Sequence, residues 1–393
     1  MFFWIHFRNI AILLMFLCLM TGSDVFAKTI KGTDKKYNKT SKREIRKRKG
    51  AKSNFSGEWK FGLGSGYVSD EINKQNISGI FGSAKINYGL HPAFAINLEP
   101  FVGLNSGQAQ SLYGEFESGN SIGVNEASVF WTPFEFVDMS AGILNQRRID
   151  NQLLIKNTTF PGIYGRIYFI KHKDFTSNVE AEGAIPTSYT MNSQARELEK
   201  TPVFYAQTLR FGFRPGKRLN GELWLTHFTF ENLPSTVAKK SNTLGNTVTN
   251  NYDFDYKFDG ISAGAKTTIP LYDDILDINL GARLLKNNKA PEGLNAGHEL
   301  SVELKISTMY EIDLRPRISL FRNEPDASPA YYNSSEYGNS NRHGYAYGIG
   351  VVFNRWNFKL NGKYIDSHLI YRDPFQAHRR TIKLTLETLD VRF

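Results

Sequence analysis

Apolar and polar side chains alternate with a period of two along most of the chain from about residue 54 onward. In one clear segment, Leu300, Val302, Leu304 and Ile306 alternate with serine, glutamate and lysine. Successive side chains of a β-strand point to opposite faces, so such a segment predicts a strand with one apolar and one polar face. The chain is therefore expected to be an all-β protein.

Sixteen segments follow this pattern. Their predicted ranges are 55–67, 77–90, 93–104, 122–131, 137–145, 163–170, 176–185, 202–213, 219–231, 253–268, 275–285, 299–309, 314–321, 343–353, 356–365 and 380–393. The period slips near Glu126, which predicts a β-bulge. The segment 314–321 is short and contains Pro316. If one of the irregular segments is misassigned, the strand number becomes 14 or 18.

The connections between the segments alternate in length. After even-numbered segments they are short: 91–92, 132–136, 171–175, 214–218, 269–274, 310–313 and 354–355. After odd-numbered segments they are long: 68–76, 105–121, 146–162, 186–201, 232–252, 286–298, 322–342 and 366–379. Short periplasmic turns and long extracellular loops are typical of transmembrane β-barrels. The pattern predicts a transmembrane antiparallel up-and-down β-barrel over 54–393 with both chain ends in the periplasm.

The last strand ends in alternating apolar residues, Leu389, Val391 and Phe393. This ending resembles the C-terminal assembly signal of bacterial outer-membrane barrels. A change of phase near Glu387 predicts a further bulge. Aromatic residues gather near the short turns, where membrane interfaces favour them: Trp59, Trp131, Phe134, Phe136, Tyr272, Tyr310, Trp356 and Phe393. With its size and strand number, the chain resembles porin-like outer-membrane β-barrel proteins of Gram-negative bacteria.

The first 27 residues have the features of a signal peptide. An apolar run, Ile10–Met20, follows Arg8, and cleavage is expected after Ala27. The run is too short to cross a bilayer as a helix. Cys18 within it is the only cysteine, so a mature chain would contain no disulfide or cysteine metal site.

The net charge of +10 comes from one segment. Residues 28–53 contain 12 Lys/Arg and two acidic residues, whereas 54–393 contain 35 of each sign. The basic segment is expected to be a disordered periplasmic tail, and its charge gives no support for nucleic-acid binding. It would contact peptidoglycan or anionic lipid, enter the barrel lumen, or act as a solvated linker.

The polar faces of the strands are expected to line the lumen. The pore-lining candidates are Lys60, Lys85, Glu99, Arg166, Glu180, Glu182, Arg210, Arg283, Glu303, Lys305, Arg315, Arg317, Lys359, Lys363 and Lys383. A 16-strand barrel is wide enough to hold water. The cations of the C-terminal half could favour anions, or the acidic residues on the opposite wall could balance them. The same groups could instead form a salt-bridged plug.

In trimeric porins the loop between strands five and six folds inward and narrows the pore. The matching loop here, 146–162, carries Arg147, Arg148, Asp150 and Lys156 around the apolar Leu153–Ile155. The resemblance implies a constriction; packing on the barrel rim is the alternative. The two longest loops, 232–252 and 322–342, are expected at the surface, where a ligand or partner could bind.

No catalytic, metal-binding or cofactor-binding motif is found. The seven histidines after the apolar run are predicted in turns or near strand ends, and no grouping has metal-ligand spacing. The leading prediction is a channel for passive diffusion of small hydrophilic solutes, embedded in outer-membrane lipid and lipopolysaccharide. The alternative is a non-conducting barrel that serves as a scaffold or surface-binding protein. The resemblance to porins also raises a homotrimer as an expectation.

Overall fold

A computed structural model describes residues 54–111, 120–156, 158–188, 199–215, 219–272, 275–308 and 310–393. The expected signal peptide and basic tail, 1–53, lie outside these residues. Phe55–Phe393 form one compact unit. Among the described residues, no helix is both long and apolar enough to cross a membrane.

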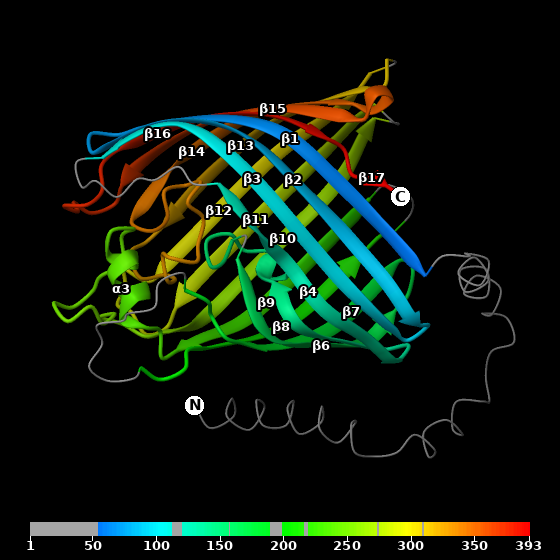
Figure 1. Cartoon of the computed structure of the whole chain (residues 1–393), viewed down its shortest axis with the longest axis horizontal. Coiled ribbons are helices and arrows are strands. Elements are labelled where there is room, and N and C mark those ends of the chain that lie inside the picture. Colours follow the sequence, from blue (N-terminus) through cyan, green and yellow to red (C-terminus); the bar gives the residue numbers. More distant parts are fainter. Residues whose placement is uncertain are drawn as a thin grey trace, which may run out of the picture. The chain divides into compact units, whose positions relative to one another are not determined.

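This unit is a closed antiparallel β-barrel, in which each strand pairs with its neighbours in chain order (Figure 1). The strands are β1 Phe55–Ser69, β2 Asn73–His91, β3 Phe94–Ser111, β4 Ser121–Phe134, β5 Val137–Asn145, β6 Thr159–Lys171, β7 Phe175–Ala184, β8 Val203–Phe213, β9 Asn220–Glu231, β10 Phe258–Tyr272, β11 Leu276–Asn287, β12 Ala296–Ser307, β13 Ile312–Asn323, β14 Arg342–Phe353, β15 Phe358–Leu369, β16 Arg379–Thr388 and β17 Val391–Arg392. β1 pairs with β2 on one edge and with β16 and β17 on the other, which closes the ring. The predicted number of 16 strands is confirmed, with β17 continuing β16.

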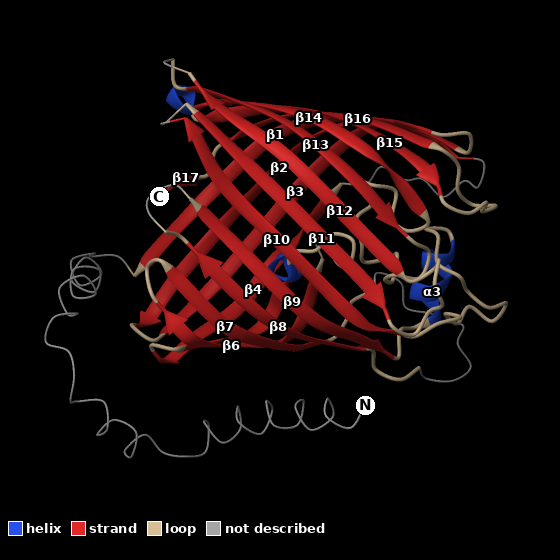
Figure 2. Ribbon diagram, turned by 180° about the vertical axis from the view of Figure 1, so that it is seen from behind, coloured by secondary structure: helices blue, strands red, loops and turns tan. Residues whose placement is uncertain are grey.

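Within the described residues, three short helices lie in the connections. They are η1 Gln146–Ile149, α3 Ser235–Asn242 and η2 Asn354–Trp356. α3 lies among the loops at one end of the barrel, whereas η1 is seen within the outline of the barrel in both views (Figures 1 and 2).

The connections sort by length almost as predicted. At the short-turn end they cover 92–93, 135–136, 172–174, 214–219, 273–275, 308–311 and 354–357. At the long-loop end they cover 70–72, 112–120, 146–158, 185–202, 232–257, 288–295, 324–341 and 370–378.

One predicted long loop is wrong. The connection expected at 68–76 is a tight turn of Asp70, Glu71 and Ile72, in which an Asp70 carboxylate oxygen accepts a hydrogen bond of 2.8 Å from the Ile72 amide. β1 and β2 stay paired up to Ser69 and Lys74. Residues 73–76 are polar on both faces, so the period of two does not reveal this strand extension.

The predicted start of β10 is also wrong. Residues 253–257 belong to the preceding loop, where Thr249 donates its amide to the Asp253 carbonyl oxygen at 2.8 Å. The apolar alternation there arises from loop packing, because the Phe254 and Phe258 rings meet edge to face with centroids 5.0 Å apart. Period two over a few residues does not separate a strand from such packing.

Both predicted bulges are confirmed. Glu99 pairs with Glu126 and Pro100 with Val124, so Asn125 is the extra residue on β4. Near the C-terminus, two residues of β1 between Trp59 and Gly62 face three residues between Glu387 and Val391. The bulge moves the apolar phase from Leu386 to Val391 and keeps both on one face of the wall.

The outer face of the wall is apolar. Leucine, isoleucine and valine side chains such as Leu63, Val302 and Leu384 are roughly half exposed, although they lie in the middle of strands. All eight aromatic residues expected near the short turns belong to the exposed set. Such a surface requires lipid, since soluble monomers rarely expose large continuous apolar areas.

Candidate channel lumen

The charged candidates from the sequence lie on the face opposite to this apolar surface. One ion pair, Arg315–Asp313, lies within β13. The others join neighbouring strands or a strand and an inward loop: Lys60–Glu387, Arg166–Glu180, Arg210–Glu180, Arg283–Glu299, Lys305–Asp277, Arg317–Glu299, Lys359–Glu387 and Lys363–Glu336. Glu303 accepts from Asn279 at 3.2 Å. Lys85 lies beside Glu99 in a polar cavity, and Glu182 binds Gln146 and Arg148 of the loop.

In most of these pairs the cation is the water-exposed partner. The Arg317 side chain is 38% exposed and its partner Glu299 0%; Lys60 is 32% exposed and Glu387 9%. Aspartate and glutamate are short and stay at the wall, whereas lysine and arginine extend their charged ends toward water. The water-exposed surface of the lumen therefore carries more positive charge than the equal numbers of acidic and basic residues in the barrel would suggest.

The loop 146–158 crosses the lumen. It leaves the wall at β5, where Arg147 pairs with Glu99 of β3 at 2.5 Å. On the far side, Asp150 accepts hydrogen bonds from Lys266 of β10 at 2.7 Å and Arg283 of β11 at 3.1 Å. Arg148 also contacts Glu182 of β7, and its carbonyl oxygen accepts a hydrogen bond from Arg210 of β8, so one loop binds five wall strands between β3 and β11 directly. A loop packed on the barrel rim, the alternative expectation, would not contact strands on both sides of the lumen.

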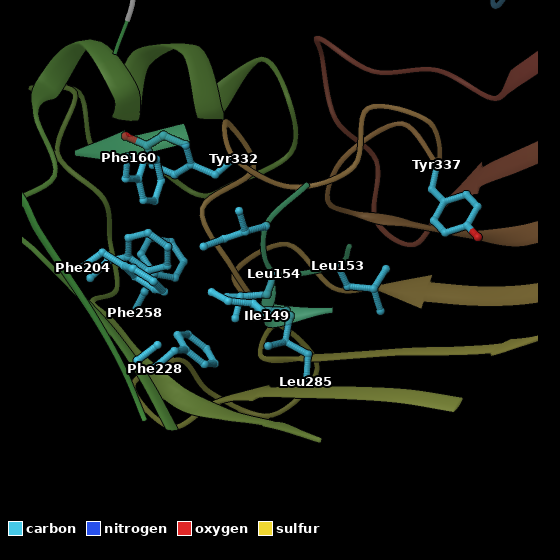
Figure 3. Close-up of a cluster of buried hydrophobic side chains, with 14 of the residues drawn as sticks. Ile149, Leu153, Leu154, Phe160, Phe204, Phe228, Phe258, Leu285, Tyr332 and Tyr337 are labelled. Atoms are coloured by element: carbon cyan, nitrogen blue, oxygen red, sulfur yellow. The ribbon is translucent and has the colours of Figure 1, made fainter. Parts of the chain in front are cut away.

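The apolar centre of this loop anchors it. Leu153, Leu154 and Ile155 are buried, and they pack with aromatic side chains of the wall and of other loops. Figure 3 shows Ile149 and Leu154 close to wall side chains that include Phe228, Phe258 and Leu285. A hydrophobic core thus lies inside the barrel, near its long-loop end.

The loop 324–341 contributes to the same core, which corrects its expected position at the surface. Tyr332 stacks on Phe230 with ring centroids 5.8 Å apart, and Tyr337 stacks on Phe321 at 4.1 Å. Part of the loop 232–257 packs there too, through the buried Val237. Tyrosine and asparagine are common in surface loops, so composition alone did not reveal this inward path.

Glu336 joins the two inward loops to the wall. Its carboxylate pairs with Lys156 of the first loop and, at 2.8 Å, with Lys363 of β15. Burial alone would raise the pKa of Glu336, but the ammonium groups of Lys156, Lys363 and Lys383 hold it well below its usual range. Glu336 was missed by the sequence analysis because it lies in a loop, where no strand period marks an inward position.

Polar cavities lie on the short-turn side of the crossing loop. One of about 710 Å³ is lined by Arg147, Arg148, Asp150, Arg166, Lys173, Asp174, Arg210, Arg214, Glu222 and Lys266 among others. Another, of about 400 Å³, is lined by Lys85, Glu99, Glu126, Arg147, Arg148 and Arg166 among others. Arginine and lysine outnumber carboxylates in the larger one.

Known proteins were compared by sequence and by structure. No protein-family model and no curated sequence matches the chain. The high-pH structure of Pseudomonas putida OprB superposes with a TM-score of 0.56 at 11% identity, covering 90% of this chain and 96% of OprB. Its low-pH structure gives 0.49 at 11% identity (90% and 99% covered), and Pseudomonas aeruginosa OprD gives 0.44 at 8% identity (86% and 95% covered). The first similarity carries the conclusion: the chain has the fold of a porin-like outer-membrane β-barrel.

Proposed function

We propose that the protein is an outer-membrane channel through which small hydrophilic solutes diffuse passively, with anions preferred. The observation that carries this proposal is the lumen surface, on which cations such as Arg317 and Lys60 face water and their carboxylate partners lie behind them. Exposed fixed cations raise the local concentration of anions in a narrow aqueous space.

The apolar belt supports the placement in the outer membrane. Lipid and lipopolysaccharide would cover this apolar outer face. The barrel suits this environment, because its strands satisfy their backbone groups in a closed ring and keep unpaired charges off the lipid face. The long-loop end would be extracellular, and the short-turn end, with both chain ends, periplasmic. The constriction would be formed by Arg147, Arg148, Asp150 and Lys156.

The inward loops favour a second function, a non-conducting barrel that presents its surface to partners. The loop 324–341 fills lumen volume at the long-loop end, where most of its residues are buried. In that case the ion pairs of the lumen would be a structural plug.

Reversal potentials across planar bilayers separate these functions. Under a gradient of KCl, a channel that prefers anions gives a reversal potential with the sign of the chloride equilibrium potential. The variants Arg147→Gln and Arg317→Gln should each shift it toward zero. Arg322→Gln is the matched control: it removes the same charge, but from the outer face beside Leu320, where Arg322 pairs with Glu324. A cation-set potential, or an equal shift by the control, would contradict the proposal.

Two expectations belong with this proposal. The basic segment 28–53 would contact peptidoglycan or anionic lipid on the periplasmic side, since dense like charge attracts anionic surfaces. The barrels would associate as a homotrimer, as trimeric porins do. Cosedimentation with peptidoglycan and mass measurement in detergent test them separately.

A further inference from the structure

A row of three histidines and one arginine crosses four strands on the outer face at the long-loop end. His298 of β12 pairs in register with Arg322, Arg322 with His343, and His343 with His368. His378 precedes β16, and its ring stacks on His368 with centroids 4.0 Å apart. Residues directly opposite on antiparallel strands have neighbouring side chains, so the imidazoles of His343, His368 and His378 lie side by side. The channel function uses none of them.

A carboxylate lies within this row. Asp366 is two residues before His368, so both side chains leave β15 on the same face. The Asp366 Oδ1 atom hydrogen-bonds the Nε2 atom of His378 and lies 3.7 Å from the Nε2 atom of His368. The donor atoms of Asp366, His368 and His378 all lie within 4.8 Å of one another.

We propose that Asp366, His368 and His378 form an external site for a divalent transition-metal ion, with Zn²⁺ as the ion that fits this donor set. Zinc takes imidazole nitrogen and carboxylate oxygen at about 2.0–2.2 Å in a tetrahedron, so its ligand atoms lie about 3.4 Å apart. The 3.7 Å between the Asp366 and His368 atoms is close to this spacing and is too long for a good hydrogen bond. Two imidazoles facing one carboxylate oxygen are satisfied together by a cation. Water would take the fourth position, because the two imidazoles remain partly exposed.

A neighbouring hydroxyl supports the carboxylate. Tyr345 donates its hydroxyl to Asp366 Oδ2 at 2.9 Å, which leaves Oδ1 for the metal. Carboxylate ligands are commonly oriented in this way by a hydrogen bond from a second residue. Ser367 lies on the other face of β15 and donates its hydroxyl to the Tyr337 carbonyl oxygen at 2.9 Å, so the cluster does not align a serine nucleophile.

Zinc titration of the metal-stripped barrel in detergent, without a polyhistidine tag, tests this site. Isothermal calorimetry should give one Zn²⁺ per chain, and Co²⁺ in its place should give the visible absorption of a tetrahedral site. The variants His368→Ala and His378→Ala should each abolish both signals. Tyr345→Phe keeps the ring and should weaken binding about tenfold, within the range for loss of such a support. Heat-modifiable migration in gels shows that each variant is folded.

The chain offers a matched control. His227 and Asp259 form a histidine–carboxylate pair on the outer face, 2.8 Å apart, and neither residue belongs to the cluster of Asp366, His368 and His378. His227→Ala should leave the zinc stoichiometry unchanged. The proposal is overturned if the wild-type chain binds no zinc, if His368→Ala or His378→Ala binds it as before, or if His227→Ala removes it. Zinc binding does not depend on conduction, so its failure leaves the channel proposal intact.

Discussion

Two carboxylates in the loops at the long-loop end differ in their partners. Glu336 is paired with lysines, whereas Asp326 accepts from neutral donors only: the Thr247 amide at 3.0 Å, the Thr247 hydroxyl at 2.7 Å and the Asn246 amide nitrogen at 3.3 Å. Burial raises the pKa of Asp326 to about 6, although the hydrogen bonds from Thr247 and Asn246 oppose this shift. The contact between the loops 232–257 and 324–341 is therefore expected to respond to pH.

The sign of this response follows from linkage. A carboxyl with a raised pKa stabilises the folded loops most below its ordinary value of 3.8, and that stability is lost as the pH rises through about 6. Asp326→Asn mimics the protonated form and should remove this part of the pH dependence. Hydrogen exchange at the Thr247 amide should lose about a hundredfold protection between pH 4 and 7 in the wild type relative to the variant. Equal pH profiles in the two proteins would show that Asp326 is not responsible.

A lysine on the outer face should destabilise the barrel. Leu384 of β16 is 52% exposed toward the expected lipid. Leu384→Lys should lower the free energy of unfolding in lipid by about 2–4 kcal/mol, if its depth is near the bilayer centre. The control Thr385→Lys places the same group on the lumen face and should cost far less. Denaturant titration in liposomes measures both, and equal losses would contradict the assignment of the two faces.

At the scale of elements, the seam between β1 and the C-terminal strand closes the ring. Phe393 exchanges backbone hydrogen bonds with Gly57, at 3.2 and 3.0 Å, and its ring lies 5.6 Å from that of Phe55. A side chain at position 57 would collide with the Phe393 ring. The glycine therefore provides the space in which the terminal aromatic ring covers the seam.

Loss of this ring should impair assembly. Phe393→Ala leaves the backbone pairing possible but uncovers Gly57, so the fraction of folded barrel in membranes should fall, while Phe393→Tyr should assemble normally. Heat-modifiability of the membrane fraction reports the outcome. Normal assembly of the alanine variant would show that Leu389, Val391 and Phe393 do not act as the expected assembly signal.

The anchor of the crossing loop gives another prediction. Leu154 is fully buried in the core inside the barrel. Leu154→Asp places an unpaired carboxylate in this core. The loop 146–158 should therefore detach from the core, and the open cross-section of the lumen should increase. Single-channel conductance should rise and become noisier. Leu154→Met conserves volume and should leave conductance unchanged. Unaltered conductance in the aspartate variant would show that this loop does not limit the pore.

Strands and loops differed in what the sequence could predict. Strand positions follow from period two, so Leu300–Ile306 and the bulge at Asn125 could be placed from the residues alone. The path of Leu153–Ile155 and of Tyr332 into the barrel depends on contacts with distant strands, for which a single sequence has no local pattern. The cluster of Asp366, His368 and His378 was missed for a related reason, since only the pairing of β15 with the start of β16 brings His378 beside His368.

At the scale of the whole molecule, the barrel combines an apolar exterior with a charged interior that holds two inward loops. The crossing loop is bound to several wall strands, and Glu336 links it to the loop 324–341 and to β15. These contacts hold two loops inside the barrel, and polar cavities of about 710 and 400 Å³ lie on the short-turn side. The central claim is that water and ions pass these inward loops.

The conductance of single barrels tests this claim most directly. The chain without residues 1–27, reconstituted in a planar bilayer in KCl, should give discrete ohmic steps of uniform size. The same steps are expected after removal of 28–53. A barrel that is inserted, shown by heat-modifiability, and yet gives no steps with or without 28–53 would contradict the channel and favour the scaffold.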